Sequence, residues 1–293
     1  MGRSRLSFMR IFYMFLLASI SLSVVASADF KAIQQNAKLS DIAYLPQPQV
    51  AGSLHDMGYV LQRYNELTET KVSYFLTKKN GKQLLVIRGT SNFENVLLDL
   101  DIQFKPDDLI GIQLHQGFSA AAKAVYLDAK SLLSKTQPIH TTGHSLGGAV
   151  ALILAMYLEK EGYNLQGSTT FGQPKVTNVL GAKQFSHLNV SRIVTPLDMV
   201  PLVPALSPLQ LQNLDIYWHL GEEVILMSGK EYALSQGLKS MLRASKFVDK
   251  VPDETNFQAH KMSHYLALIQ QKQNGALQVP YKTGINVFGF SLD

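Results

Sequence analysis

Two kinds of apolar pattern alternate along this chain. In some stretches β-branched and aromatic residues lie close together, as in strands, and in others apolar residues recur at helical spacing. Strands are predicted over residues 71–79, 82–88, 139–142, 168–171, 191–195, 217–220 and 222–227. Helices are predicted over residues 117–135, 149–158, 232–248 and 259–271. Because strands and helices alternate, we expect an α/β fold with a mostly parallel central sheet and helices on both faces.

Short glycine-containing turns predict two hairpins. Asn80-Gly81 joins the first two strands and is a strong hairpin signal, because both turn positions tolerate a positive φ. Gly221 separates residues 217–220 from residues 222–227, which predicts a second hairpin there.

The first 28 residues have a composition of their own. Arg3, Arg5 and Arg10 precede an almost wholly apolar run over residues 11–25, and Ala26-Ser27-Ala28 follows it. This layout is typical of a secretory signal peptide, and the apolar run is short for a membrane-spanning helix. We therefore expect residues 1–28 to be removed on export and residues 29–293 to form one domain. The mature protein would be secreted or periplasmic, with no stable membrane span.

Setting this segment aside changes the charge of the chain. It holds three of the 27 basic residues and none of the 22 acidic ones, so 24 basic residues remain against 22 acidic, a net charge of +2. The basic character is thus a targeting feature, and no nucleic-acid partner is expected. Cysteine is absent, which excludes disulfides and thiolate chemistry.

A short motif, Gly143-x-Ser145-x-Gly147, lies between a predicted strand and a predicted helix. A sharp turn in this context exposes the serine in a strained backbone, and only glycine-sized neighbours allow the chain to approach so closely. The helix N-terminus then offers backbone N–H groups to a developing oxyanion. The motif predicts a nucleophilic serine on an α/β-hydrolase fold.

A serine nucleophile needs a histidine base that is oriented by a carboxylate, and in this fold they follow the serine in the order acid, then base. Asp198 suits the acid, because it follows a predicted buried strand and lies between two prolines in a mostly apolar turn. The rival acids are Asp215, Asp249 and Asp253. His260 suits the base, at the start of a predicted helix, and its rivals are His187, His219 and His264.

Taken together, these residues resemble the class 3 lipase family, typified by fungal triacylglycerol lipases. The resemblance rests on Val86-Ile87-Arg88-Gly89-Thr90, His115-Gln116-Gly117-Phe118, the residues 142–148, the residues 170–176 and Asp198-Met199-Val200-Pro201. His260-x-Met262-x-x-Tyr265 is similar to the histidine segment of bacterial and plant members, which favours His260 over His264, and we expect a bacterial-type member of the family. Residues 229–257 have no counterpart in it.

The family resemblance implies roles for further residues. The backbone N–H groups of Thr90 and Leu146 would form the oxyanion hole, whose donors are typically worth about 3 kcal/mol each. Arg88 and His115 are interpreted as structural. The family often carries a lid after its oxyanion strand, and residues 93–104 interleave apolar and polar residues in that place. An ordinary core-facing helix is the alternative for this segment.

The resemblance implies hydrolysis of lipid esters, possibly at a lipid–water interface, through an acyl-enzyme. A phospholipase A or an esterase of soluble esters on the same fold is the alternative. A catalytically silent lipid-binding protein is a further alternative, because a fold does not fix a function. No cofactor and no metal is expected, since the pair His260 and His264 lacks a third ligand.

Overall fold

The structure is a computed structural model that describes residues 28–90, 103–204, 215–243 and 252–282, with the strands β14 (Asn286–Val287) and β15 (Phe290–Ser291). The expected signal peptide therefore lies outside the described residues, apart from Ala28. No helix in the described ranges has the length and apolar content needed to cross a membrane.

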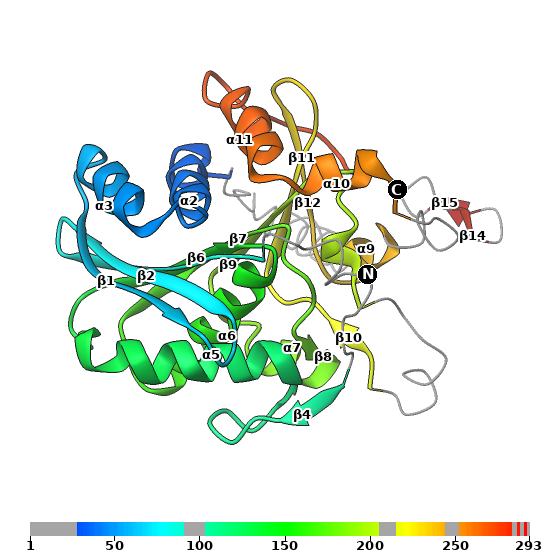
Figure 1. The fold of residues 1–293 in the computed structure, drawn as a ribbon. Coiled ribbons are helices and arrows are strands. Elements are labelled where there is room, and N and C mark those ends of the chain that lie inside the picture. Colours follow the sequence, from blue (N-terminus) through cyan, green and yellow to red (C-terminus); the bar gives the residue numbers. More distant parts are fainter. Residues whose placement is uncertain are drawn as a thin grey trace, which may run out of the picture.

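A nine-stranded sheet forms the centre of the molecule (Figure 1). In spatial order its strands are β1 (Val60–Leu67), β2 (Val72–Lys79), β3 (Lys82–Ile87), β6 (Ile139–His144), β7 (Leu165–Phe171), β9 (Val190–Val194), β11 (Glu222–Leu226), β12 (Glu231–Ser235) and β13 (Leu277–Gln278). The strands from β3 to β11 run parallel, and antiparallel pairs flank them. The prediction of a mostly parallel sheet is confirmed.

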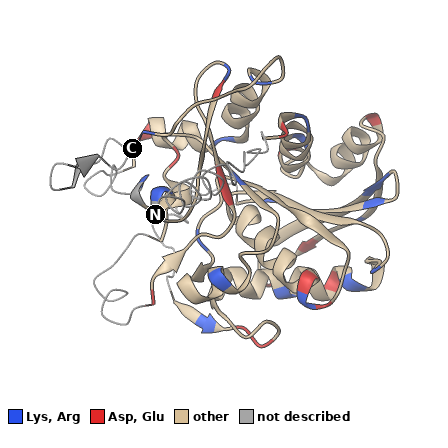
Figure 2. Cartoon of the chain, turned by 180° about the vertical axis from the view of Figure 1, so that it is seen from behind, with Lys and Arg blue, Asp and Glu red and all other residues tan. Residues whose placement is uncertain are grey.

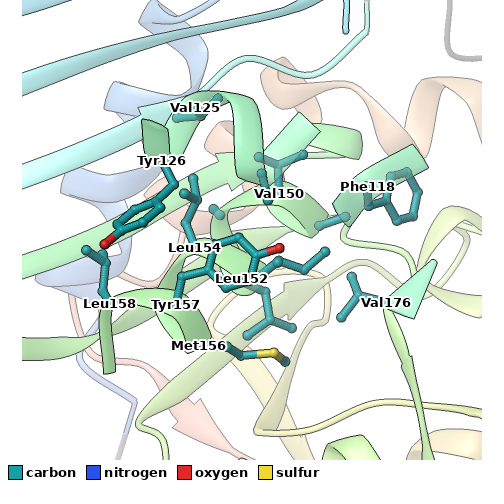
Figure 3. Packing of buried hydrophobic residues seen from close by; sticks show 14 of the residues in the cluster. Phe118, Val125, Tyr126, Val150, Leu152, Leu154, Met156, Tyr157, Leu158 and Val176 are labelled. Atoms are coloured by element: carbon teal, nitrogen blue, oxygen red, sulfur yellow. The ribbon is translucent and has the colours of Figure 1, made fainter. Parts of the chain in front are cut away.

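Apolar residues on both faces of the central strands explain the layers. On one face, α5 (Gln116–Ala129) and α6 (Leu146–Lys160) pack against β2 and β3, and α6 is buried from Gly147 to Leu158 (Figure 3). On the other face lie α2 (Phe30–Ile42), α3 (Gln47–Asp56) and α11 (Met262–Gln270). Strands covered on both sides are expected to be rich in apolar residues, as β2 and β3 are. The strands β6 and β7 also bury polar residues, and the hydroxyls of Thr141 and Thr142 are hydrogen-bonded to carbonyl oxygens.

The first predicted hairpin is confirmed, and the second is wrong. Asn80 and Gly81 both have a positive φ, of 50° and 76°, in the turn between β2 and β3. In contrast, β10 (Tyr217–Trp218) belongs to a second sheet with β8 (Thr177–Asn178), β5 (Gln113–His115) and β4 (Phe104–Pro106). Gly221 is therefore where the chain crosses between sheets. The hairpin partner of β11 is β12, because β11 joins the central sheet and its outer edge needs a partner.

Three predicted helices also differ from the structure. Residues 231–235 form β12, so the helix expected over residues 232–248 is reduced in the described part to α9 (Gly237–Leu242). Lys261 is extended, with a ψ of 139°, and it divides the helix predicted over residues 259–271 into α10 (Glu254–His260) and α11. His260 thus ends a helix and does not begin one. Residues 130–132 of the helix predicted over residues 117–135 form a 3-10 turn.

The candidate lid lies mostly outside the described residues, which resume at Gln103. Phe104, the last residue of the candidate lid, belongs to β4, where its ring stacks on Tyr217 at a centroid distance of 3.9 Å. The remaining described elements are the short α7 (Val179–Gln184) and the 3-10 turn at Val200–Leu202. Acidic and basic residues are interspersed along the described elements (Figure 2).

Candidate active site

Ser145 occupies the turn between β6 and α6. Its φ of 58° and ψ of −130° are a conformation that residues with a side chain rarely adopt. The Ser145 N–H donates a hydrogen bond of 2.8 Å to Phe171 O at the end of β7, which holds the turn against the sheet. A strained serine between a strand and a helix is the geometry that the sequence motif predicts.

The glycines of the motif are required by close contact. A Cβ on Gly147 would lie 2.3 Å from Ile87 O, and one on Gly143 would lie 2.4 Å from Gly147 O. Both distances are too short for any real side chain. The turn at Ser145 can therefore pass between β3 and β7 only with glycine at these two positions.

Asp198 and His260 form a buried pair. His260 Nδ1 donates to Asp198 Oδ2 at 2.9 Å, and both side chains are almost completely buried. The Val200 N–H donates to the other oxygen, Oδ1, at 2.9 Å. Burial would raise the pKa of Asp198, but the charge of His260 and hydrogen bonds from His260, Tyr265 and Val200 outweigh it and hold that pKa below its ordinary value.

Three contacts bring this pair to the serine turn. His144, the neighbour of Ser145, lies 2.7 Å through its Nε2 from His260 O, and the two rings are 4.5 Å apart. Gly172 follows Phe171, the acceptor of the Ser145 N–H. A Cβ on Gly172 would lie 2.8 Å from both Asp198 Oδ2 and His260 Cε1. Ser145, Asp198 and His260 therefore meet at the carboxyl end of the parallel strands.

His144 and Tyr44 were not singled out by the sequence patterns. The Tyr44 hydroxyl lies 2.7 Å from His144 Nδ1, so both nitrogens of His144 have partners. Burial and the nearby His260 lower the pKa of His144 to about 3, so its ring is neutral. Its position next to Ser145 in the motif was the only available signal, and nothing in the sequence around Tyr44 indicated this contact.

The rival bases lie elsewhere. His264 is exposed on α11, and His187 is exposed beside Glu159, 3.2 Å from its Oε1. His219 is half-buried, and its Nε2 donates to Pro201 O at 2.6 Å. None of the three is placed against the serine turn by a contact of the described residues.

Two of the rival acids have structural partners. Asp215 accepts a hydrogen bond from Asn178, and Asp253 caps the N-terminus of α10. Asp249 lies outside the described residues.

The two expected oxyanion donors belong to segments that lie next to Ser145. Leu146 is the first residue of α6, where a backbone N–H has no partner within the helix. Thr90 follows Gly89, and a Cβ on Gly89 would lie 3.2 Å from Ser145 Cβ, so the segment after β3 passes directly against the serine. Both segments therefore run beside the nucleophile.

Arg88 and His115 have contacts of a structural kind. His115 Nδ1 accepts from the Phe118 N–H at the start of α5, and Arg88 lies 3.6 Å from Glu66. Within the described ranges, no three histidine, cysteine, aspartate or glutamate side chains gather as metal ligands would.

Comparison of the sequence with known proteins finds similarity to lipases. Residues 84–207 match the model of the class 3 lipases. A secreted mono- and diacylglycerol lipase of Fusarium solani is 32% identical over 38% of this chain and 36% of its own length. A lipase of Rhizopus niveus is 29% identical over 51% of this chain and 42% of its own. The chain thus spans about two fifths of the length of these curated relatives. Both relatives are fungal and do not support the expected bacterial type.

The fold comparison agrees with the family match. The mono- and diacylglycerol lipase of Aspergillus oryzae superposes with a TM-score of 0.68 at 18% identity, over 83% of this chain and 99% of that one. This likeness identifies the α/β-hydrolase fold expected from the serine motif. Residues 84–207 of this chain are thus similar to the class 3 lipase family.

Proposed function

We propose that this protein hydrolyses carboxylic esters of lipids. Ser145 would be the nucleophile, His260 the base, and Asp198 the carboxylate that orients His260. The observation that carries the proposal is the buried His260–Asp198 pair beside a serine in a strained strand-to-helix turn. Such a pair can take the proton of the serine while the carboxylate stabilises the imidazolium that forms.

The proposed reaction has two steps. Ser145 Oγ attacks the ester carbonyl as its proton passes to His260, and the N–H groups of Thr90 and Leu146 stabilise the oxyanion. The ester C–O bond then breaks, and His260 gives its proton to the leaving alcohol. In the second step water attacks the acyl-enzyme and gives its proton to His260. The acid is released and Ser145 regains its hydrogen.

Acylglycerols are the substrates we propose first, because the Fusarium relative is named as a mono- and diacylglycerol lipase. Residues 93–104 would act as a lid that exposes its apolar face at a lipid surface. We also propose that residues 1–28 direct export and that residues 29–293 belong to a single enzyme domain, secreted or periplasmic. Phospholipids and soluble esters are the alternative substrates.

The direct test compares purified wild type with Ser145→Ala. Wild type should react with a serine-directed phosphonate and hydrolyse esters, and the variant should lose about 10³- to 10⁶-fold in kcat while it stays folded. An unreactive wild type would instead indicate a silent lipid-binding protein. A panel of soluble esters, acylglycerols and phospholipids of graded chain length then ranks the substrates. A rise in rate above the solubility limit would identify a lipase.

A further inference from the structure

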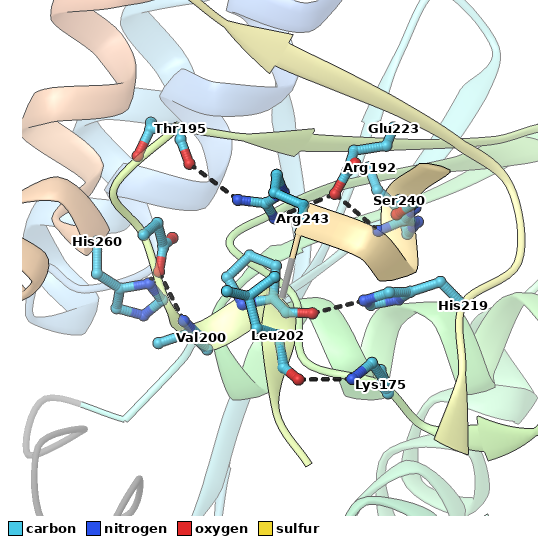
Figure 4. Close-up of polar contacts among 12 residues, drawn as sticks. Lys175, Arg192, Thr195, Val200, Leu202, His219, Glu223, Ser240, Arg243 and His260 are labelled. Atoms are coloured by element: carbon cyan, nitrogen blue, oxygen red, sulfur yellow. Dashed lines mark hydrogen bonds and ion pairs between the residues drawn. The ribbon is translucent and has the colours of Figure 1, made fainter. Parts of the chain in front are cut away.

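Four ionisable side chains that take no part in the proposed reaction are buried together, and a fifth, that of His219, lies half-buried beside them (Figure 4). They come from five places in the fold, since Lys175 follows β7 and His219 follows β10, while Arg243 follows α9. Arg192 lies in β9 and Glu223 in β11. We call these five residues the buried cluster.

The buried cluster donates hydrogen bonds to the segment that carries Asp198. Lys175 Nζ donates to Leu202 O at 2.5 Å and to Pro204 O at 2.8 Å. His219 Nε2 donates to Pro201 O at 2.6 Å, and Arg243 Nη1 donates to Thr195 O at 3.3 Å. The backbone of residues 195–204 is thus held on both sides of Asp198 by side chains from other elements.

Glu223 links the two arginines of the buried cluster. Its Oε1 lies 3.1 Å from Arg243 Nη2 and 3.6 Å from Arg192 Nη1, and Arg192 also donates to Leu220 O and Ser240 Oγ. Within the described residues, Glu223 Oε2 and Arg243 Nε have no hydrogen-bond partner.

Stability alone is a poor explanation for this arrangement. Glu223 is the single carboxylate of the cluster and is shared by two arginines. Burying charges with incomplete pairing costs more than apolar packing would. The hydrogen bonds of Lys175, His219 and Arg243 instead fix four carbonyl oxygens of residues 195–204, which a set of apolar side chains could not do.

We propose that Lys175, His219 and Arg243 are positioning residues, which fix the loop of residues 195–204 so that Asp198 Oδ2 meets His260 Nδ1 in the orientation needed for catalysis. Arg192 and Glu223 hold Arg243 in place. This inference rests on the proposed triad. Misplacing a reacting group by about 1 Å can cost about 100-fold in rate. Losing the hydrogen bonds that fix this loop should therefore lower the rate.

The test uses Lys175→Met, which keeps the length of the side chain and removes both hydrogen bonds. Lys175→Arg restores a cation that can donate. The matched control is Lys272→Met, because Lys272 is also buried and donates to three carbonyls, those of Met227, Gly229 and Leu268, far from residues 195–204. Both methionine variants lose a buried lysine, but only the first releases the acid loop.

Three quantities are measured on each folded variant: kcat and KM for a soluble ester, the pH profile of kcat, and the downfield proton resonance of the His260–Asp198 hydrogen bond. We expect Lys175→Met to lower kcat by about 10- to 100-fold. KM should stay the same, and the proton resonance should broaden or shift. Lys175→Arg should recover most of kcat, and Lys272→Met should lose stability while kcat, pH profile and resonance stay at wild-type values.

If Lys175→Met keeps kcat and the resonance, the positioning role is wrong. If it does not fold, His219→Phe tests the same loop at Pro201 with a smaller expected loss. The resonance separates this inference from the proposed function. A wild type that hydrolyses no ester overturns the proposed function, whereas the change in the His260–Asp198 proton still decides whether the buried cluster positions Asp198.

Discussion

Tyr265 and His260 donate hydrogen bonds to the same oxygen of Asp198. The Tyr265 hydroxyl lies 2.5 Å from Asp198 Oδ2, and His260 Nδ1 lies 2.9 Å from it. Tyr265 is fully buried on α11, one turn beyond the break at Lys261. The negative charge that stabilises a protonated His260 is therefore divided between two donors.

Tyr265→Phe should strengthen the electrostatic stabilisation of protonated His260 by the Asp198 carboxylate. With the hydroxyl removed, more of the carboxylate charge faces the imidazolium, so the acidic limb of kcat/KM against pH should move to higher pH. The variant should also lose about 1.5–3 kcal/mol of unfolding free energy, the usual contribution of a hydrogen bond to a charged group. Denaturant unfolding and a pH–rate profile on a soluble ester measure both effects.

Tyr232→Phe is the matched control for this variant. Tyr232 is equally buried, but its hydroxyl donates to the neutral Gln278 side chain. We expect a smaller loss of stability and an unchanged pH profile. An acidic limb that moves equally in both variants, or in neither, contradicts the proposed division of charge.

Gly172→Ala should abolish most activity. The main cause would be a steric clash with Asp198 and His260, in addition to backbone strain at the positive φ. The new methyl group would lie 2.8 Å from Asp198 Oδ2 and from His260 Cε1, so one of these groups must move. A displacement of about 1 Å predicts a loss of about 100-fold in kcat. Gly162→Ala is the control, since Gly162 also has a positive φ, of 75°, but has open space around it. It should cost about 1–2 kcal/mol of stability and leave kcat unchanged.

His260→Ala should lose as much activity as Ser145→Ala, whereas His264→Ala should keep nearly all of it. The reason is position, since His260 is buried against Asp198 and His264 is exposed on α11. Steady-state kinetics on a soluble ester, with circular dichroism as the check of folding, distinguish the two. Normal turnover in folded His260→Ala would rule out the assigned base.

The sequence predicted well where a local pattern determines the structure. Asn80-Gly81 specifies its own turn, and Gly143-x-Ser145-x-Gly147 specifies a strand-to-helix turn, so both could be placed before the fold was known. The choice of Asp198 and His260 followed from chain order and family resemblance. Their juxtaposition is a finding of the structure, and their catalytic roles stay predictions.

The predictions failed where distant contacts decide the structure. Residues 231–235 form a strand because the edge of β11 needs a partner, although their spacing is compatible with a helix. Tyr217 and Glu222 are close in sequence but join different sheets. Tyr44 contacts the ring of His144, and Lys175 donates to the carbonyl of Leu202. Both partners lie far along the chain, and no local pattern indicates such contacts.

Lys175 should make the free energy of unfolding depend on pH in the alkaline range. Burial, and the charges of Arg192 and Arg243, lower its pKa from 10.5 to about 7, while Glu223 acts in the opposite direction. Between these values the unfolded chain binds the proton that the folded protein has released, so the free energy of unfolding should rise with pH from about 7 to 10.5. Chemical unfolding of wild type and Lys175→Met across this range should give a difference that grows in favour of wild type. A difference that does not change with pH would mean that Lys175 keeps its proton in the folded state.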